Sequence, residues 1–177
     1  DKISPDDIDY GKQLNFVLKP LSVGMQNKSQ ITLGSFPAFV KTDSLLASIQ
    51  NENNAVLVNA ENVGGTMYSG PGAGAKPTAN SVLSDVIDIA RGKIFDYGKF
   101  VEQNLSSSFD NFSCDRYLKL QVNDKPGVVA KISTLLANNN LSIDNLIQKE
   151  LERSDDQIPL VMVLSNSDET TIQDTIK

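Results

Sequence analysis

The sequence predicts an α+β protein in two parts: a mixed, largely antiparallel sheet domain with helices, followed by a smaller βαββα unit. Three observations support this prediction. Residues 16–40 read as two strands joined by a polar turn. A glycine-rich turn runs directly into an amphipathic helix over residues 70–91. The apolar pattern then restarts over residues 118–164 as a strand, a helix and two further strands.

Composition limits the class of protein and its partners. The chain has 177 residues, 40% of them hydrophobic, which is enough for ordinary globular cores. A net charge of −6 without a Lys/Arg cluster argues against a nucleic-acid partner. Cys114 is the only cysteine and no long apolar run exists, so we expect neither an intrachain disulfide nor a membrane span. A cytoplasmic location fits best, and a start without Met or a signal-like segment suggests a fragment.

The first part begins with a helix. Ser4 is a good capping residue, Pro5 suits the first turn, and Asp6 and Asp7 lie at the positive end, so we expect a helix from about Pro5 to Leu14. The apolar runs that follow predict strands at residues 16–24, 30–40, 55–58 and 66–68, and a short helical turn at 45–49. Pro20 and Pro37 place their strands at sheet edges or bulges.

The most informative stretch is Gly70–Arg91, with the sequence GPGAGAKPTANSVLSDVIDIAR. Its glycines at 70, 72 and 74 permit positive φ angles and close approach of a ligand. Pro77 suits the first turn of the helix, and Gly92 ends it. Backbone N–H groups at such a helix start can hold a phosphate or an amide carbonyl. The spacing fits neither a P-loop nor a dinucleotide fingerprint, and a tight turn without a ligand remains the alternative.

The second part follows a stretch rich in serine and asparagine, which we interpret as a linker. Alternating Leu118, Leu120 and Val122 predict a strand, and a helix then ends at residues 138–140. Strands at 141–150 and 158–164 and a helix from Asp168 complete a βαββα order, which stops where a last strand would finish a ferredoxin-like βαββαβ unit. The predicted division is therefore residues 1–92, linker 93–113 and residues 114–177.

Nearly the whole chain, apart from the stretch near residues 93–113, resembles homoserine dehydrogenases. The resemblance lies in the glycine turn with its helix, and in DDIDYGKQLNFVLKPLSVG (6–24), LLASIQNENNAVLVNAENVGGTMYSGPGAG (45–74) and DKPGVVAKISTLLANNNLSIDNLIQKE (124–150). These segments occur in the order that the family shows. Ser44–Ala47 departs from the His-Pro-Leu-Ala run more common there. The resemblance implies the C-terminal part of a substrate and dimerisation domain. The whole enzyme would interconvert aspartate semialdehyde and homoserine, in threonine and methionine biosynthesis.

The second part, with a D-x-P-G turn at residues 124–127, resembles an ACT domain, a small amino-acid-binding module. The resemblance implies that N–H groups near Gly127 and Val128 hold the carboxylate of an amino acid. Regulated homoserine dehydrogenases would make that amino acid threonine. The residues expected at this regulatory ligand are Asp124, Lys125, Gly127, Val128 and Gln148. A plain strand-to-helix turn is the alternative.

The resemblance also implies a nicotinamide cofactor, NADP or NAD, with contacts from Gly72, Ala73 and Gly74. The chain contains no histidine, and its acidic residues lack the spacing of a metal site. Asp85 and Asp88 read as a solvated helix face. In the family, the dinucleotide fold and the lysine and aspartate credited with proton transfer would precede Asp1. We therefore assign no catalytic residue to this chain.

Two other functions stay open at this stage. The chain could be a non-catalytic amino-acid-binding regulatory module whose first part only dimerises. An aspartate kinase fused to a dehydrogenase is less favoured, because such chains usually carry their ACT units ahead of the dehydrogenase part. In either case a lone βαββαβ sheet has a bare face and exposed edges, so we expect a homodimer or a higher homo-oligomer. The other expected partners are the small-molecule substrate and threonine.

Overall fold

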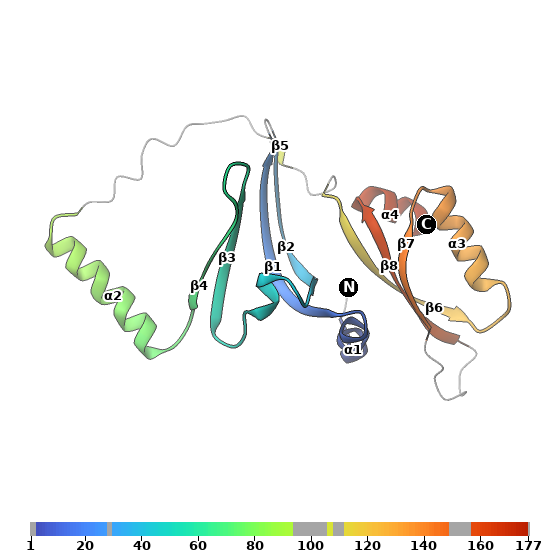
Figure 1. Cartoon of the computed structure of the whole chain (residues 1–177), viewed down its shortest axis with the longest axis horizontal. Coiled ribbons are helices and arrows are strands. Elements are labelled where there is room, and N and C mark those ends of the chain that lie inside the picture. The colour runs from blue at the N-terminus through green and yellow to red at the C-terminus, as the bar shows by residue number, and fades with distance from the viewer. Residues whose placement is uncertain (1–2, 28–29, 94–105, 108–111, 149–156, 177) are drawn as a thin grey trace. The chain divides into compact units, whose positions relative to one another are not determined.

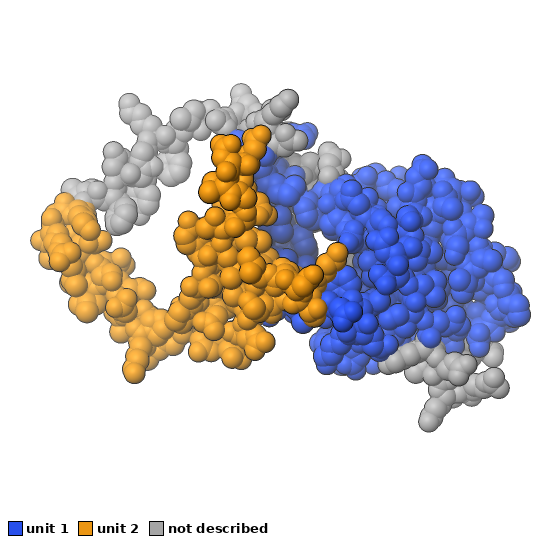
Figure 2. All heavy atoms as spheres, in the orientation of Figure 1, with its two compact units in different colours: residues 1–39, 104–177 blue, residues 40–103 orange. Residues whose placement is uncertain are grey.

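The computed structural model describes residues 3–27, 30–93, 106–107, 112–148 and 157–176 (Figure 1). These residues form two compact units, residues 1–39 with 104–177 and residues 40–103 (Figure 2). The predicted domain boundaries differ from this division. Most of the predicted linker, 93–113, lies outside the described residues, so those boundaries stay a prediction.

The first unit ends in an antiparallel sheet with the strand order β6-β8-β7. Its elements are β6 (Cys114–Asn123), α3 (Val128–Asn138), β7 (Ile143–Gln148), β8 (Gln157–Ser167) and α4 (Glu169–Ile176). This order confirms the predicted βαββα unit. The connection between the predicted strands at 141–150 and 158–164 lies almost wholly outside the described residues.

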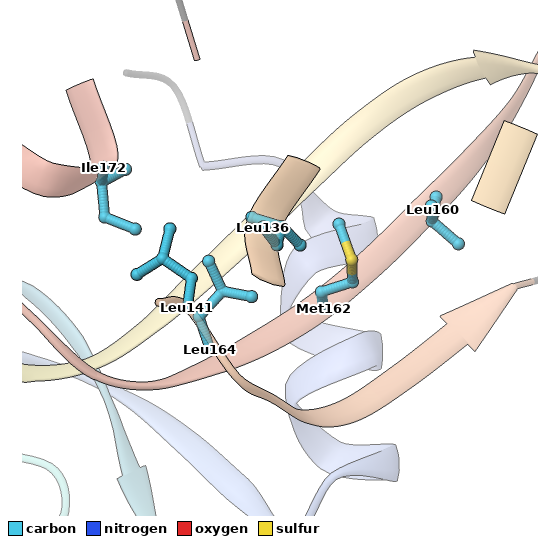
Figure 3. Packing of buried hydrophobic residues seen from close by; sticks show 6 residues of the cluster. All are labelled: Leu136, Leu141, Leu160, Met162, Leu164 and Ile172. Carbon is cyan, nitrogen blue, oxygen red and sulfur yellow. The ribbon is translucent and has the colours of Figure 1, made fainter. Parts of the chain in front are cut away.

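The core of this sheet lies between its central strand and the two helices. The buried side chains that form it are Leu136, Leu141, Leu160, Met162, Leu164 and Ile172 (Figure 3). Leu118, Leu120 and Val122 of β6 pack against the same cluster, as their alternation in the sequence predicts. The intervening residues of β6 and β8 therefore face the other side of the sheet.

The same unit begins with α1 (Pro5–Gln13), which leads into β1 (Phe16–Asn27) and β2 (Gln30–Lys41). The sheet order is β1-β2-β5, and β5 (Ser106–Ser107) runs parallel to β2. The predicted helix and two strands are confirmed. The pairing of β5 covers only the first two residues of β2, so Pro37 lies beyond it. β5 was not predicted, because two serines give no periodic signal.

The second unit contains a short 3-10 helix (Leu45–Ser48), an antiparallel hairpin of β3 (Asn53–Ala60) and β4 (Gly64–Pro71), and the helix α2 (Ala75–Ala90). All four elements were predicted. Both strands are longer than their apolar residues indicate, because backbone pairing extends into the polar ends. No residue of α2 is buried, and Val82, Leu83 and Val86 are each more than half exposed.

None of the helices in the described part combines the length and the apolar character needed to cross a membrane.

Candidate functional site

The glycine turn leaves backbone N–H groups exposed at the start of α2. Gly74 takes φ +116°, and its carbonyl accepts the hydrogen bond from the Thr78 N–H at 3.1 Å. The N–H groups of Ala75 and Lys76 come before this first turn closes, so they have no partner within the helix. Both residues are exposed. Such a helix start can hold an anionic or carbonyl oxygen.

The three glycines of this turn differ in backbone conformation and in the space beside them. Gly70 neither takes a positive φ nor has another atom near the position of a Cβ. A Cβ on Gly72 would overlap the side-chain amide of Asn54, and the Gly72 N–H donates to the Glu52 carbonyl at 2.7 Å. A side chain at position 72 would therefore displace the exposed Asn54 side chain. Only Gly74 uses the positive φ that the sequence suggested for all three.

Gly74 is also the position with room for a ligand. A Cβ there would meet only the Pro77 ring, at 3.5 Å from Cδ. Open space beside a backbone with free N–H groups fits a flat group that approaches closely. The cofactor contacts expected of Gly72, Ala73 and Gly74 stay a prediction, and the geometry favours Gly74 among them.

The second turn with a predicted ligand joins β6 to α3. Gly127 takes φ +88°, and the Lys131 N–H donates to its carbonyl at 3.0 Å as the first helical hydrogen bond. The Val128 N–H donates to the Lys125 carbonyl at 3.3 Å, so only the N–H groups of Val129 and Ala130 lack a partner within the helix. Asp124 and Lys125 are exposed beside this turn.

Gln148 lies farther from this turn than expected. It belongs to β7, and β8 separates β7 from β6. Gln148 is level with Leu120, since both pair with Leu160, and neighbouring strands are about 5 Å apart, so a ligand at the turn lies well over about 10 Å from the Gln148 backbone within one chain. The structure thus brings together Asp124, Lys125, Gly127 and Val128 but not Gln148. The regulatory assignment of all five remains a prediction.

A polar group that sequence reasoning missed joins α1 to β6. We call Ser4, Asp7, Tyr117 and Lys119 the Asp7 cluster. The Asp7 Oδ1 atom lies 2.5 Å from Lys119 Nζ and accepts a hydrogen bond of 2.8 Å from the Tyr117 hydroxyl. The Oδ2 atom accepts from the Ser4 N–H and from its hydroxyl, both at 2.7 Å. Lys119 Nζ also donates to Ser4 Oγ at 3.0 Å.

The Asp7 cluster is stable because each polar group is satisfied. Asp7 is only 4% exposed, and an ionised carboxylate is tolerated there because both its oxygens accept charge-assisted hydrogen bonds. Burial alone would raise the pKa of this carboxyl. The hydrogen bonds from Lys119, Ser4 and Tyr117 outweigh burial, and the pKa lies far below its ordinary value. Burial and the bond to Asp7 raise the pKa of the Tyr117 hydroxyl.

Apolar contacts surround this cluster on the second face of the C-terminal sheet. The rings of Phe39 and Tyr117 have centroids 4.8 Å apart, and a Cβ on Gly11 would overlap Phe39. Val161 and Val163 of β8 are buried, although they alternate with the core residues and point to this face. The expectation of a bare sheet face is therefore wrong for this part of the sheet, because α1 and β2 cover it.

Acid should weaken this junction. The depressed pKa of Asp7 means that the unfolded state takes up a proton more readily than the folded state. The stabilisation is complete above the unfolded pKa and is lost as pH falls, from about pH 5 downwards. Urea unfolding of the parent between pH 7 and pH 3 should show this loss, and Asp7→Asn should flatten the dependence. Asp9 forms an exposed ion pair with Lys12, so Asp9→Asn is the control. It should keep the parent's dependence of the unfolding free energy on pH. An unchanged slope in Asp7→Asn would assign the acid sensitivity to other carboxylates.

Each of the two parts of the chain matches a known protein family. Residues 1–87 match the model of the family described as homoserine dehydrogenase, and residues 116–177 match that of the ACT domain. A homoserine dehydrogenase of Pseudomonas aeruginosa is 33% identical over 99% of this chain and 43% of its own length. One of Helicobacter pylori is 36% identical over 87% of this chain and 37% of its own length.

Among solved structures, a homoserine dehydrogenase from Thiobacillus denitrificans matches 98% of this chain with a TM-score of 0.80 and 28% identity. The match takes in 41% of that protein. The chain thus spans about two fifths of the length of the relatives it matches.

Proposed function

Because this chain belongs to the homoserine dehydrogenase family and carries an ACT domain, we propose that it supplies the C-terminal part of an NAD(P)-dependent homoserine dehydrogenase. The reaction would interconvert aspartate semialdehyde and homoserine. One observation carries the proposal: residues 1–87 match the homoserine dehydrogenase model, residues 116–177 match the ACT model, and a homoserine dehydrogenase aligns with 99% of the chain. In this proposal residues 1–92 belong to the substrate and dimerisation domain and residues 114–177 to the ACT domain.

The contribution of this chain to the cofactor site would come from the glycine turn. The nicotinamide group, when bound, accepts or donates the hydride. Gly74 would let it approach the backbone, since no side chain occupies that side. The N–H groups of Ala75 and Lys76 would hold one of its oxygens at the positive end of α2. The proposal leaves open whether NAD or NADP is used.

We further propose that the turn at residues 124–128 binds threonine and that the protein acts as a homodimer in the cytoplasm. The support for an amino-acid carboxylate as ligand is that residues 124–127 are exposed and lead into a helix start, where the N–H groups of Val129 and Ala130 precede the first helical hydrogen bonds. β7 forms an edge of the described sheet, and an exposed edge favours pairing with a second chain. A ligand between two such chains could also reach Gln148 of the partner.

The test is an enzyme assay on the product of the gene that encodes this chain. We expect homoserine-dependent reduction of NAD⁺ or NADP⁺, followed by nicotinamide absorbance, and inhibition by millimolar L-threonine. Activity without any effect of threonine, methionine or other aspartate-family amino acids would reject the regulatory part. Threonine binding by calorimetry without dehydrogenase activity would instead favour the non-catalytic regulatory module.

A further inference from the structure

The strand β6 connects the contact with α1 to the turn that is proposed to bind an amino acid. The outward side chains of β6, Tyr117 and Lys119, hold the first turn of α1 through Asp7. The same strand ends at Asn123, directly before the turn proposed to bind an amino acid. Lys119 and Asp124 are five residues apart, about 17 Å along an extended strand. β6 therefore carries the Asp7 contacts on its outward side and leads directly into the proposed ligand turn.

The Asp7 cluster has the properties of a two-state contact. When it is closed, the Asp7 carboxylate is buried and fully hydrogen-bonded. A half-open form would leave a buried charge without its partner, which is strongly unfavourable. An open form in which water surrounds both Asp7 and Lys119 avoids that cost. Coupling through this junction requires exchange between the closed form and this hydrated open form.

We propose that the Asp7 cluster couples occupancy of the turn at residues 124–128 to α1. Ser4, Asp7, Tyr117 and Lys119 are positioning residues in this scheme, since they touch neither substrate nor cofactor. α1 packs on β1, so a change in its docking reaches the substrate domain. The inference rests on the proposed function, because it takes an amino acid to be the ligand of that turn. By linkage, the coupling acts equally in both directions.

The experiment measures amide hydrogen exchange by mass spectrometry on this 177-residue chain, with and without millimolar L-threonine. In the parent, threonine should slow exchange in residues 124–131 and change it in residues 5–13. In Asp7→Asn, the response of residues 5–13 should fall about fivefold or more, while the turn remains protected. Asp9→Asn is the matched control on the same helix, with an exposed pair to Lys12, and should respond like the parent. The coupling would be overturned if threonine left exchange in residues 5–13 of the parent unchanged. It would also be overturned if these residues responded as strongly in Asp7→Asn as in the parent.

A comparison without ligand tests the coupling independently of threonine. If threonine does not bind, the proposed effector is wrong, and the reciprocal comparison decides the coupling. Without ligand, Asp7→Asn should alter exchange in residues 124–131 by about threefold or more relative to Asp9→Asn. No difference would disprove the coupling whatever the ligand is. If Asp7→Asn does not fold, Tyr117→Phe serves both comparisons, because it removes one hydrogen bond and keeps the ring against Phe39.

Discussion

Leu136→Ala should lower the free energy of unfolding of the ACT domain by about 3 kcal/mol. Leu136 is 3% exposed and lies in the cluster between α3, α4 and the central strand β8. Truncating it removes buried apolar surface and leaves a cavity that the neighbouring side chains fill only in part. Alanine is a good helix former, so the loss reports packing rather than helix propensity. Urea unfolding followed by circular dichroism measures it.

The adjacent residue provides the control. Leu135 belongs to the same helix, but it is 50% exposed, so Leu135→Ala should cost less than about 1 kcal/mol. Similar losses at the two positions would contradict the described orientation of α3. A large loss at Leu135 alone would mean that another surface covers that side of the helix.

Gly74→Val should raise the Michaelis constant for the nicotinamide cofactor by about tenfold or more, equivalent to about 1.4 kcal/mol of binding. The added side chain fills the open space beside the turn and blocks close approach. The positive φ of Gly74 also strains any larger residue. Steady-state kinetics with each cofactor on the complete gene product give the result.

Two neighbouring glycines separate a cofactor effect from a structural one. Gly70→Ala meets no atom and no unusual φ, so stability and kinetics should match the parent. Gly72→Ala displaces the exposed Asn54 side chain and should lower the stability by less than about 1 kcal/mol. If Gly74→Val keeps the parent's cofactor constant, the turn does not contact the cofactor. If it loses activity only through unfolding, thermal melting will show this.

Much of this fold could be predicted because its signals are local. Ser4 and Pro5 define the start of α1, and alternating Leu118, Leu120 and Val122 define β6 together with the side that faces the core. Gly127 identifies the turn before α3 through its positive φ. Capping, periodicity and backbone freedom act over a few residues, so the chain itself carries them. The order of elements, and with it the family resemblance, followed from the sequence alone.

Tertiary structure decided which residues meet across long separations. From the sequence, Asp7 is an acidic residue at a helix start. Only the fold brings it to Lys119 and to Tyr117, which is 110 residues away along the chain. The same contact covers a sheet face that the sequence left bare. Gly72 reads as a ligand-facing glycine until Asn54 occupies the space beside it. These outcomes depend on how whole elements pack, because the groups that stabilise a buried charge or occupy the space beside a glycine lie far away in the sequence. A local sequence pattern does not contain this information.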